Sequence, residues 1–185
     1  MERKSKVSPA SRGVVAMVQM FVYRVGIDPR GRVLLILADK EGKRLLPMVI
    51  GQFEAKAIAM ELVGQHFERP LTHDLLQNVV ASLGHRVERV DVTKLEDETF
   101  FAELTLAGQD DVVKVDSRPS DAIALALRAG APIYVWDEVL DRAAVRPEDI
   151  AIEGEGVAPA EGEDEADIER VRRLLEDMQI DDEEQ

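Results

Sequence analysis

Residues 17–50, MVQMFVYRVGIDPRGRVLLILADKEGKRLLPMVI, contain three apolar runs that are separated by two short polar segments. The runs are Met17–Ile27, Arg32–Ala38 and Arg44–Ile50, and the segments between them read DPRG and DKEG. Aspartate, proline and glycine in such segments favour tight turns, so the stretch predicts three consecutive antiparallel strands. Pro47 has no N–H group to donate to a sheet, which places the third strand at an edge or a bulge.

The spacing of apolar residues then changes from a strand period to a helix period. Residues 51–63 and 72–83 repeat apolar side chains every three or four positions, and each segment is followed by a glycine. This pattern predicts two amphipathic helices in series. The second helix has the clearer apolar stripe, which consists of Leu75, Leu76, Val79, Val80 and Leu83.

The following residues add three strands, a third helix, a short strand and a short helix. These elements are expected at Arg86–Lys94, Thr99–Leu106, Asp111–Val115, Pro119–Ala129, Ile133–Trp136 and Asp137–Ala144. Proline at its first position and Gly130 after its last one mark the bounds of the third helix. Strands that occur in runs indicate an α+β fold. We predict a mixed, largely antiparallel sheet with three main helices, in the order βββ-αα-βββ-α-β-α.

Composition divides the chain into one domain and two polar ends. Residues 1–14 are expected to be a disordered N-terminus, residues 15–150 an α+β domain, and residues 151–185 an acidic linker with a short C-terminal helix. The net charge is −14, of which residues 153–185 carry −11, with 14 acidic side chains against three arginines. An apolar stripe in residues 164–178 predicts a helix that docks on the domain or on a protein partner, or one that frays in solvent.

Several classes of protein are excluded by composition. The chain contains no cysteine, so disulfides, thiolate-bound zinc and a thiol nucleophile are ruled out. No run reaches the roughly 18 apolar residues of a membrane span, so we expect no membrane association and a cytoplasmic location. The domain without its acidic end has a net charge of only −3, which provides no general attraction for nucleic acid but is compatible with a local basic groove.

Two predicted helix starts share the same local chemistry. Residues 69–74 read RPLTHD and residues 116–121 read DSRPSD, so each start combines an arginine, a proline, a hydroxyl group and an acid. Helix capping explains these residues without any further role, because hydroxyl and carboxylate oxygens accept bonds from free N–H groups. A helix start also binds anions, and an adjacent arginine strengthens the binding of a phosphate.

The second interpretation also supplies ligands for a metal ion. Asp116, Asp121, Asp74 and His73 would provide oxygen and imidazole ligands for Mg²⁺ or Mn²⁺. A metal held in this way activates water for phosphodiester hydrolysis. The remaining polar residues are explained more simply. Glu54 complements a helix dipole, and His66 and His85 have surface or packing roles near helix ends.

The sequence resembles the bacterial bifunctional nuclease family in several ordered blocks. The blocks are LPMVIG at 46–51, EA at 54–55, AIA at 57–59, RPLTHDL at 69–75, DSRPSDAIALA at 116–126 and PIYV at 132–135. The SRPSDA segment is the most specific of them, and the resemblance covers residues 17–145. It implies a compact α+β domain, often an oligomer, with nuclease activity on DNA and RNA.

The resemblance and the helix starts together suggest a metal-assisted nuclease that forms a homo-oligomer. The candidate catalytic residues are His73, Asp74, Asp116 and Asp121, and the candidate phosphate ligands are Arg69, Arg118, Ser117 and Ser120. Asp116, Asp121 and Asp74 are the expected metal ligands. The alternative is a non-catalytic regulatory or binding domain in which the same residues cap helices. A shared active centre requires that the two helix starts meet in one cleft.

Overall fold

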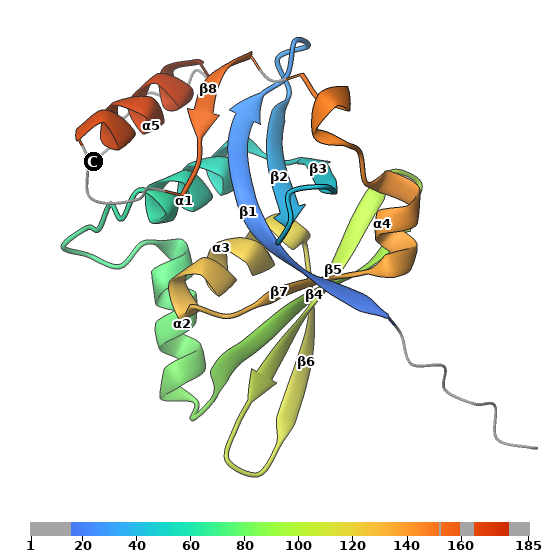
Figure 1. Ribbon diagram of the computed structural model, residues 1–185. Helices are drawn as coiled ribbons and strands as arrows, with labels where there is room; N and C mark the ends of the chain where they lie inside the picture. The colour runs from blue at the N-terminus through green and yellow to red at the C-terminus, as the bar shows by residue number, and fades with distance from the viewer. Residues whose placement is uncertain (1–15, 152, 160–164, 178–185) are drawn as a thin grey trace, which may run out of the picture.

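The computed structural model describes residues 16–151, 153–159 and 165–177, and Figure 1 shows their arrangement. The elements are β1 (Met17–Ile27), β2 (Val33–Asp39), β3 (Leu45–Val49), α1 (Gln52–Leu62), α2 (Thr72–Ser82), β4 (Arg86–Glu96), β5 (Thr99–Ala107), β6 (Val112–Ser117), α3 (Pro119–Ala129), β7 (Ile133–Trp136), α4 (Asp137–Ala143), a 3₁₀ helix η1 (Pro147–Asp149), β8 (Glu153–Val157) and α5 (Glu165–Asp177). The predicted strands and helices up to α4 are all confirmed. The N-terminal segment 1–14 lies outside the described residues. None of the described helices has the length and apolar character that a membrane span requires.

The strands form one sheet in the order β3-β2-β1-β7-β4-β5-β6. Neighbouring strands in this order are antiparallel except for β4 and β7, which are parallel. The predicted α+β fold with a mixed, largely antiparallel sheet is therefore confirmed. β3 lies at an edge, so the missing N–H group of Pro47 leaves no gap between two strands.

The main core lies between this sheet and the helices on one of its faces. α1 packs against β1 and β2, α3 packs against β4 and β5, and Figure 1 shows α1, α2 and α3 on the same side. The opposite side chains of β2 form a smaller cluster with Leu45, and this cluster packs against Val145 and Ile150 beyond α4. Because β2 is buried on both faces, its sequence VLLILA is apolar throughout instead of alternating.

The apolar stripe of α2 points away from the core. Of its five residues only Val80 is buried, whereas Leu75, Leu76, Val79 and Leu83 are 56%, 41%, 44% and 71% exposed. The inner side of the helix carries the buried His73 and also Gln77, whose Nε2 donates to the carbonyl oxygen of Arg128 at 3.2 Å. The amphipathic pattern thus predicts the helix correctly, but polar contacts decide which of its sides faces the core.

The residues beyond 151 are attached to the domain. β8 pairs with β1, where Val157 lies opposite Val25, and α5 packs against β8 and α1. Val157, Val171 and Leu174 are at most 5% exposed. The linker interpretation is therefore wrong for β8, and the docked helix is the alternative observed for α5. Glycine and glutamate are rare in strands, so the sequence EGEGV of β8 gave no strand signal.

Candidate functional site at the starts of three helices

The starts of α1, α2 and α3 surround one groove of about 620 Å³. Its charged or titratable lining residues are Glu54, Lys56, His73, Arg118, Asp121 and Arg128. Residues 70–73 line one part of it, and Arg118 and Asp121 line another. The two helix starts that share their chemistry in the sequence therefore do meet in one cleft.

His73 and Asp121 approach each other within this groove. The Nε2 atom of His73 lies 3.5 Å from Oδ1 of Asp121. The side chain of His73 is 11% exposed and that of Asp121 is 32% exposed. A carboxylate next to an imidazole fixes the orientation of the ring and can exchange a proton with it. Both residues line the groove, and solvent reaches Asp121 more readily than His73.

Arg118 connects the start of α3 to α1. Its Nε donates to Oδ2 of Asp121 at 2.7 Å, and its Nη2 donates to Oε1 of Glu54 at 2.6 Å. These two bonds, with that to Asp121 as the larger influence, raise the pKa of Arg118 above its ordinary value. The residue has an extended backbone immediately before Pro119, as the residue ahead of a proline prefers. Its side chain is 67% exposed, so the guanidinium remains accessible to a ligand.

The carboxylate of Glu54 occupies the open space beside Gly51 while it is bonded to Arg118. A β-carbon at position 51 would lie 2.1 Å from Oε2 of Glu54, so the end of this flexible side chain would have to move. Gly51 precedes the first turn of α1, and Glu54 is the acid of that turn. The sequence explains Glu54 by the helix dipole alone, so its contact with Arg118 is a finding of the structure.

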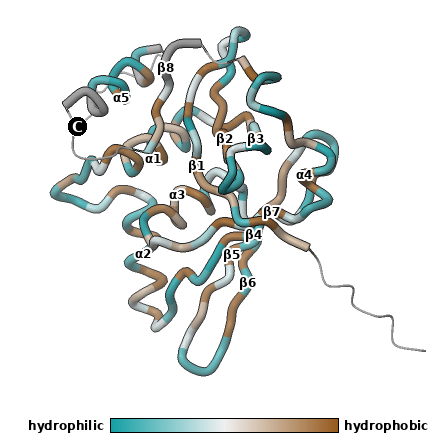
Figure 2. Tube along the Cα trace, in the orientation of Figure 1, coloured by the Kyte–Doolittle hydropathy of each residue, from teal (hydrophilic) through white to brown (hydrophobic). Residues whose placement is uncertain are grey.

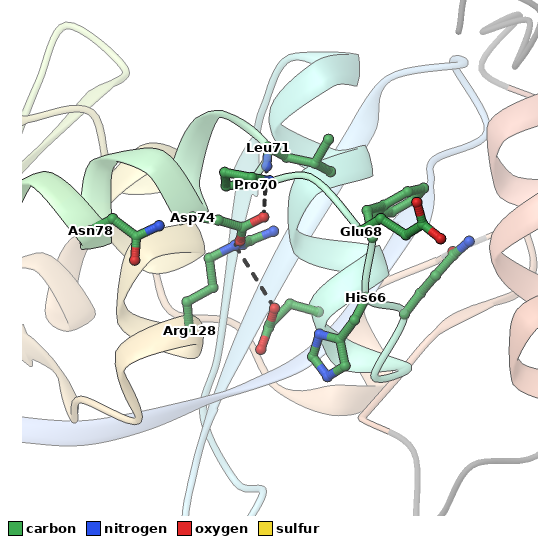
Figure 3. A pocket seen from close by; sticks show the side chains of 10 residues that line it. His66, Glu68, Pro70, Leu71, Asp74, Asn78 and Arg128 are labelled. Carbon is green, nitrogen blue, oxygen red and sulfur yellow. Dashed lines mark hydrogen bonds and ion pairs between the residues drawn. The ribbon is translucent and has the colours of Figure 1, made fainter.

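Asp74 is used to hold the start of α2. Its Oδ1 accepts a bond from Nε of Arg128 at 2.5 Å, and its Oδ2 accepts one from the N–H group of Leu71 at 2.8 Å. Figure 3 shows the side chains of Asp74 and Arg128 directed toward each other. Burial by itself raises the pKa of Asp74, but the bonds from Leu71 and Arg128 outweigh it, so the pKa lies below its ordinary value. The capping interpretation therefore describes the contacts of this residue.

Arg128 joins all three helices from the end of α3. Its side chain is 5% exposed, and besides Asp74 it donates to the carbonyl oxygens of Ala57 at 3.2 Å and Ala124 at 2.9 Å. It also lines a second pocket of about 320 Å³, which shares Pro70 and Leu71 with the groove (Figure 3). An arginine in the last turn of a helix is ordinarily explained by the helix dipole, so no local sequence signal marks this residue.

The other candidate residues do not line the groove. Asp116 is exposed on β6 opposite Glu103. Ser117 follows it, and its buried Oγ has no hydrogen-bond partner among the described residues. Ser120 is 6% exposed in the first turn of α3, and Arg69 is exposed before α2. Their assignment as catalytic or phosphate-binding residues stays a prediction.

The three carboxylates expected to bind a metal do not converge. Asp121 lines the groove, Asp74 is bonded through both oxygens, and Asp116 lies on β6 outside the groove. Among the described residues, no three acidic or histidine side chains are grouped so that they could hold a metal ion. Mg²⁺ requires several oxygen ligands in near-octahedral geometry. This donor set therefore does not fit a metal held by the protein alone.

The described structure defines an α+β domain with an acid–base pair and a guanidinium group in a groove at its helix starts. Residues 35–148 match the bifunctional nuclease domain, and the chain belongs to this family. The uncharacterized protein Rv1829 of Mycobacterium tuberculosis is 40% identical over 155 residues, which are 84% of this chain and 90% of that protein.

Plant proteins that are named as nucleases are also similar to the chain. Bifunctional nuclease 2 of Arabidopsis thaliana is 32% identical over 110 residues, which are 58% of this chain and 33% of the plant protein. Bifunctional nuclease 2 of Oryza sativa subsp. japonica is 29% identical over 105 residues, 55% of this chain and 32% of that protein. The plant proteins are thus matched over about a third of their length.

Proposed function

We propose that the protein is a nuclease that hydrolyses phosphodiester bonds in DNA and RNA. The observation that carries the proposal is the approach of His73 Nε2 to Asp121 Oδ1 in a groove that also presents Arg118. Membership of the bifunctional nuclease domain family and the names of the plant relatives support it.

The groove offers a place for one phosphate group of a nucleic acid. Arg118 is exposed at the start of α3, where the N–H groups of the first turn add positive potential. A guanidinium group can form two parallel bonds with a phosphate. Because Arg118 is bonded to Glu54 and Asp121 in the free protein, substrate binding would exchange one of these bonds for a phosphate oxygen.

Asp121 and His73 would move the proton in the hydrolysis. Asp121 accepts a proton from a water molecule in the groove while the water oxygen bonds to phosphorus and the bond from phosphorus to the leaving oxygen breaks. The proton then returns to the leaving oxygen through His73. General acid–base catalysis of this kind contributes about 10²–10⁴-fold to a rate. We assign no role in the chemistry to Asp74, because both of its oxygens are bonded within the protein.

A nuclease assay on highly purified protein tests this assignment. Single-turnover cleavage of labelled DNA and RNA oligonucleotides is measured for wild type, Asp121→Asn and His73→Gln. We expect both variants to be slower by roughly 100-fold or more. Asp110→Asn, in the exposed turn between β5 and β6, and His66→Gln, in the second pocket, are the matched controls and should keep the wild-type rate. Folded Asp121→Asn and His73→Gln proteins that cut at the wild-type rate would refute the proton-transfer roles of the two residues.

A non-catalytic nucleic-acid or protein-binding domain is the second candidate function. It is favoured by the pairing of Arg118 and Arg128 with carboxylates, since neither guanidinium is left without an internal partner. In this case the wild-type protein cleaves oligonucleotides no faster than the Asp121→Asn variant does. Binding of an uncleaved oligonucleotide or a protein would then depend on Arg118 but not on His73.

A further inference from the structure

β6 is an edge strand whose outer side has no strand partner among the described residues. It is the last strand in the sheet order, and its six residues VVKVDS contain no proline. Its pairing with β5 is continuous from Val112 to Ser117 without a bulge. Folded proteins usually protect such edges, because the free N–H and C=O groups readily pair with another chain.

Exposed apolar side chains accompany this free edge. Val113 and Val115 lie opposite Leu106 and Leu104, on the helix-covered side of the sheet, and are 40% and 38% exposed. The apolar stripe of α2 is exposed as well, and Figure 2 shows hydrophobic segments on both α2 and β6. A bond of 3.1 Å between His85 Nε2 and Asp111 Oδ1 joins the end of α2 to the start of β6. Exposed apolar side chains along a free sheet edge favour an interaction with another chain there.

The sequence of β6 is complementary to itself in one antiparallel register. If two copies pair about a two-fold axis at Val115, each Lys114 lies opposite Asp116 of the other copy, and Val113 lies opposite Ser117. A register centred on Lys114 or on Asp116 opposes like charges, and one centred on Val113 places Lys114 opposite Val112. Residues directly opposite in antiparallel strands interact most strongly, so only the register at Val115 pairs both charges of the strand with opposite ones.

We infer that two copies of this chain pair through β6, antiparallel and centred on Val115, and so continue the sheet across a two-fold axis. Lys114 already contacts Glu103 at 2.5 Å within its own chain, and Asp116, directly opposite Glu103, would gain a basic neighbour from the second copy. Val113 and Val115, which share one face of β6, would be partly covered by the same contact. This inference does not depend on the nuclease proposal, because it uses only the edge of the sheet.

Variants of the whole chain in which the charges of Lys114 and Asp116 are reversed test both the dimer and its register. Sedimentation velocity over a wide concentration range should show a dimer for wild type. Lys114→Glu places acid opposite acid, and Asp116→Lys places base opposite base, so each should weaken the dimer by roughly 100-fold. The double variant Lys114→Glu/Asp116→Lys restores opposite charges and should restore the dimer. Circular dichroism of all three variants verifies that they are folded.

A second measurement does not rely on charged variants. Val115→Lys at the centre of the contact should give a monomer, whereas Val49→Lys, at an exposed valine of the other edge strand β3, should leave the dimer intact. A wild-type protein that is monomeric at every concentration would overturn the inference. A dimer that survives both single charge variants and Val115→Lys would also overturn it, because the contact would then lie elsewhere.

Discussion

His73 Nε2 on α2 and Asp121 Oδ1 on α3 lie 3.5 Å apart, and the aspartate is the more exposed of the two. The contact exists because two helix starts of similar sequence face one another across the groove. Arg118 and Glu54 extend it into a network that links α3 to α1. Each helix thus brings at least one charged or titratable group to the same groove, and single substitutions can separate the groups that bind and react from those that hold the helices.

Loss of the charge of Arg118 should weaken nucleic-acid binding more than it affects stability. Arg118→Gln removes the exposed guanidinium, so binding of a labelled oligonucleotide should weaken and the slope of log affinity against log salt should fall by about 1. Fluorescence anisotropy over a salt series measures both. Arg146→Gln, an exposed arginine outside the groove, is the control and should keep the wild-type slope. An unchanged slope for Arg118→Gln would remove this residue from the binding site.

Arg128 should matter for stability because its guanidinium is buried and joins three helices. Arg128→Gln leaves Asp74 and the carbonyl of Ala57 without their partner, and bonds to charged groups contribute about 1.5–3 kcal/mol each. We expect the free energy of unfolding in urea to fall by about 2–4 kcal/mol. Arg146→Gln, whose ion pairs are exposed, should change it by less than about 1 kcal/mol. Equal effects of the two substitutions would contradict the structural role of Arg128.

Acid should destabilise the protein partly through Asp74. Its folded-state pKa is lowered, so its contribution to stability is fully present above its unfolded pKa and is lost as the pH falls through its folded value. Urea unfolding should therefore show stability falling below about pH 4, with Asp28 and Asp39, whose pKa values are also lowered, contributing to the fall. Asp74→Asn should make this dependence shallower, and Asp110→Asn, in an exposed turn, should leave it unchanged. An Asp74→Asn protein with the wild-type pH dependence would exclude this cause.

A divalent metal should bind the free protein weakly. The carboxylates of Asp74, Asp116 and Asp121 do not surround a common point, so calorimetric titration with Mg²⁺ or Mn²⁺ should give little heat and an affinity no tighter than millimolar. Calcium serves as a comparison for nonspecific binding to the acidic surface. Micromolar binding of Mn²⁺ that disappears in Asp121→Asn would show that the metal site predicted from the sequence forms after all.

The sequence predicts the strands and helices up to α4 because their signals are local. Turn residues separate the strands, and Pro119 and Gly130 bound α3 at the predicted positions. β8 was not predicted, because it forms only by pairing with β1, which lies far from it in the sequence. The direction of the α2 stripe also depends on distant partners, since Arg128 and the core decide which side of the helix is covered.

The candidate site was predictable in part. The shared chemistry of the two helix starts selects His73, Arg118 and Asp121, which the structure places around one groove. The capping bond of Asp74 agrees with one of the two interpretations of the sequence, but its bond with Arg128 could not be predicted, because Arg128 lies in a segment that carries no functional motif. Glu54 could not be selected either, since an acid in a first helical turn is common and its partner Arg118 lies on another helix.

The position of β1 in the sheet affects how the chain can fold during synthesis. β1 leaves the ribosome before its neighbours β2, β7 and β8, and the last of these ends at residue 157. The hydrogen-bonding groups on one side of β1 therefore have no strand partner until β7 and β8 have been translated. A domain built from such distant pairings folds slowly compared with one of local contacts. The nascent chain is therefore expected to need protection from aggregation until β7 and β8 have emerged.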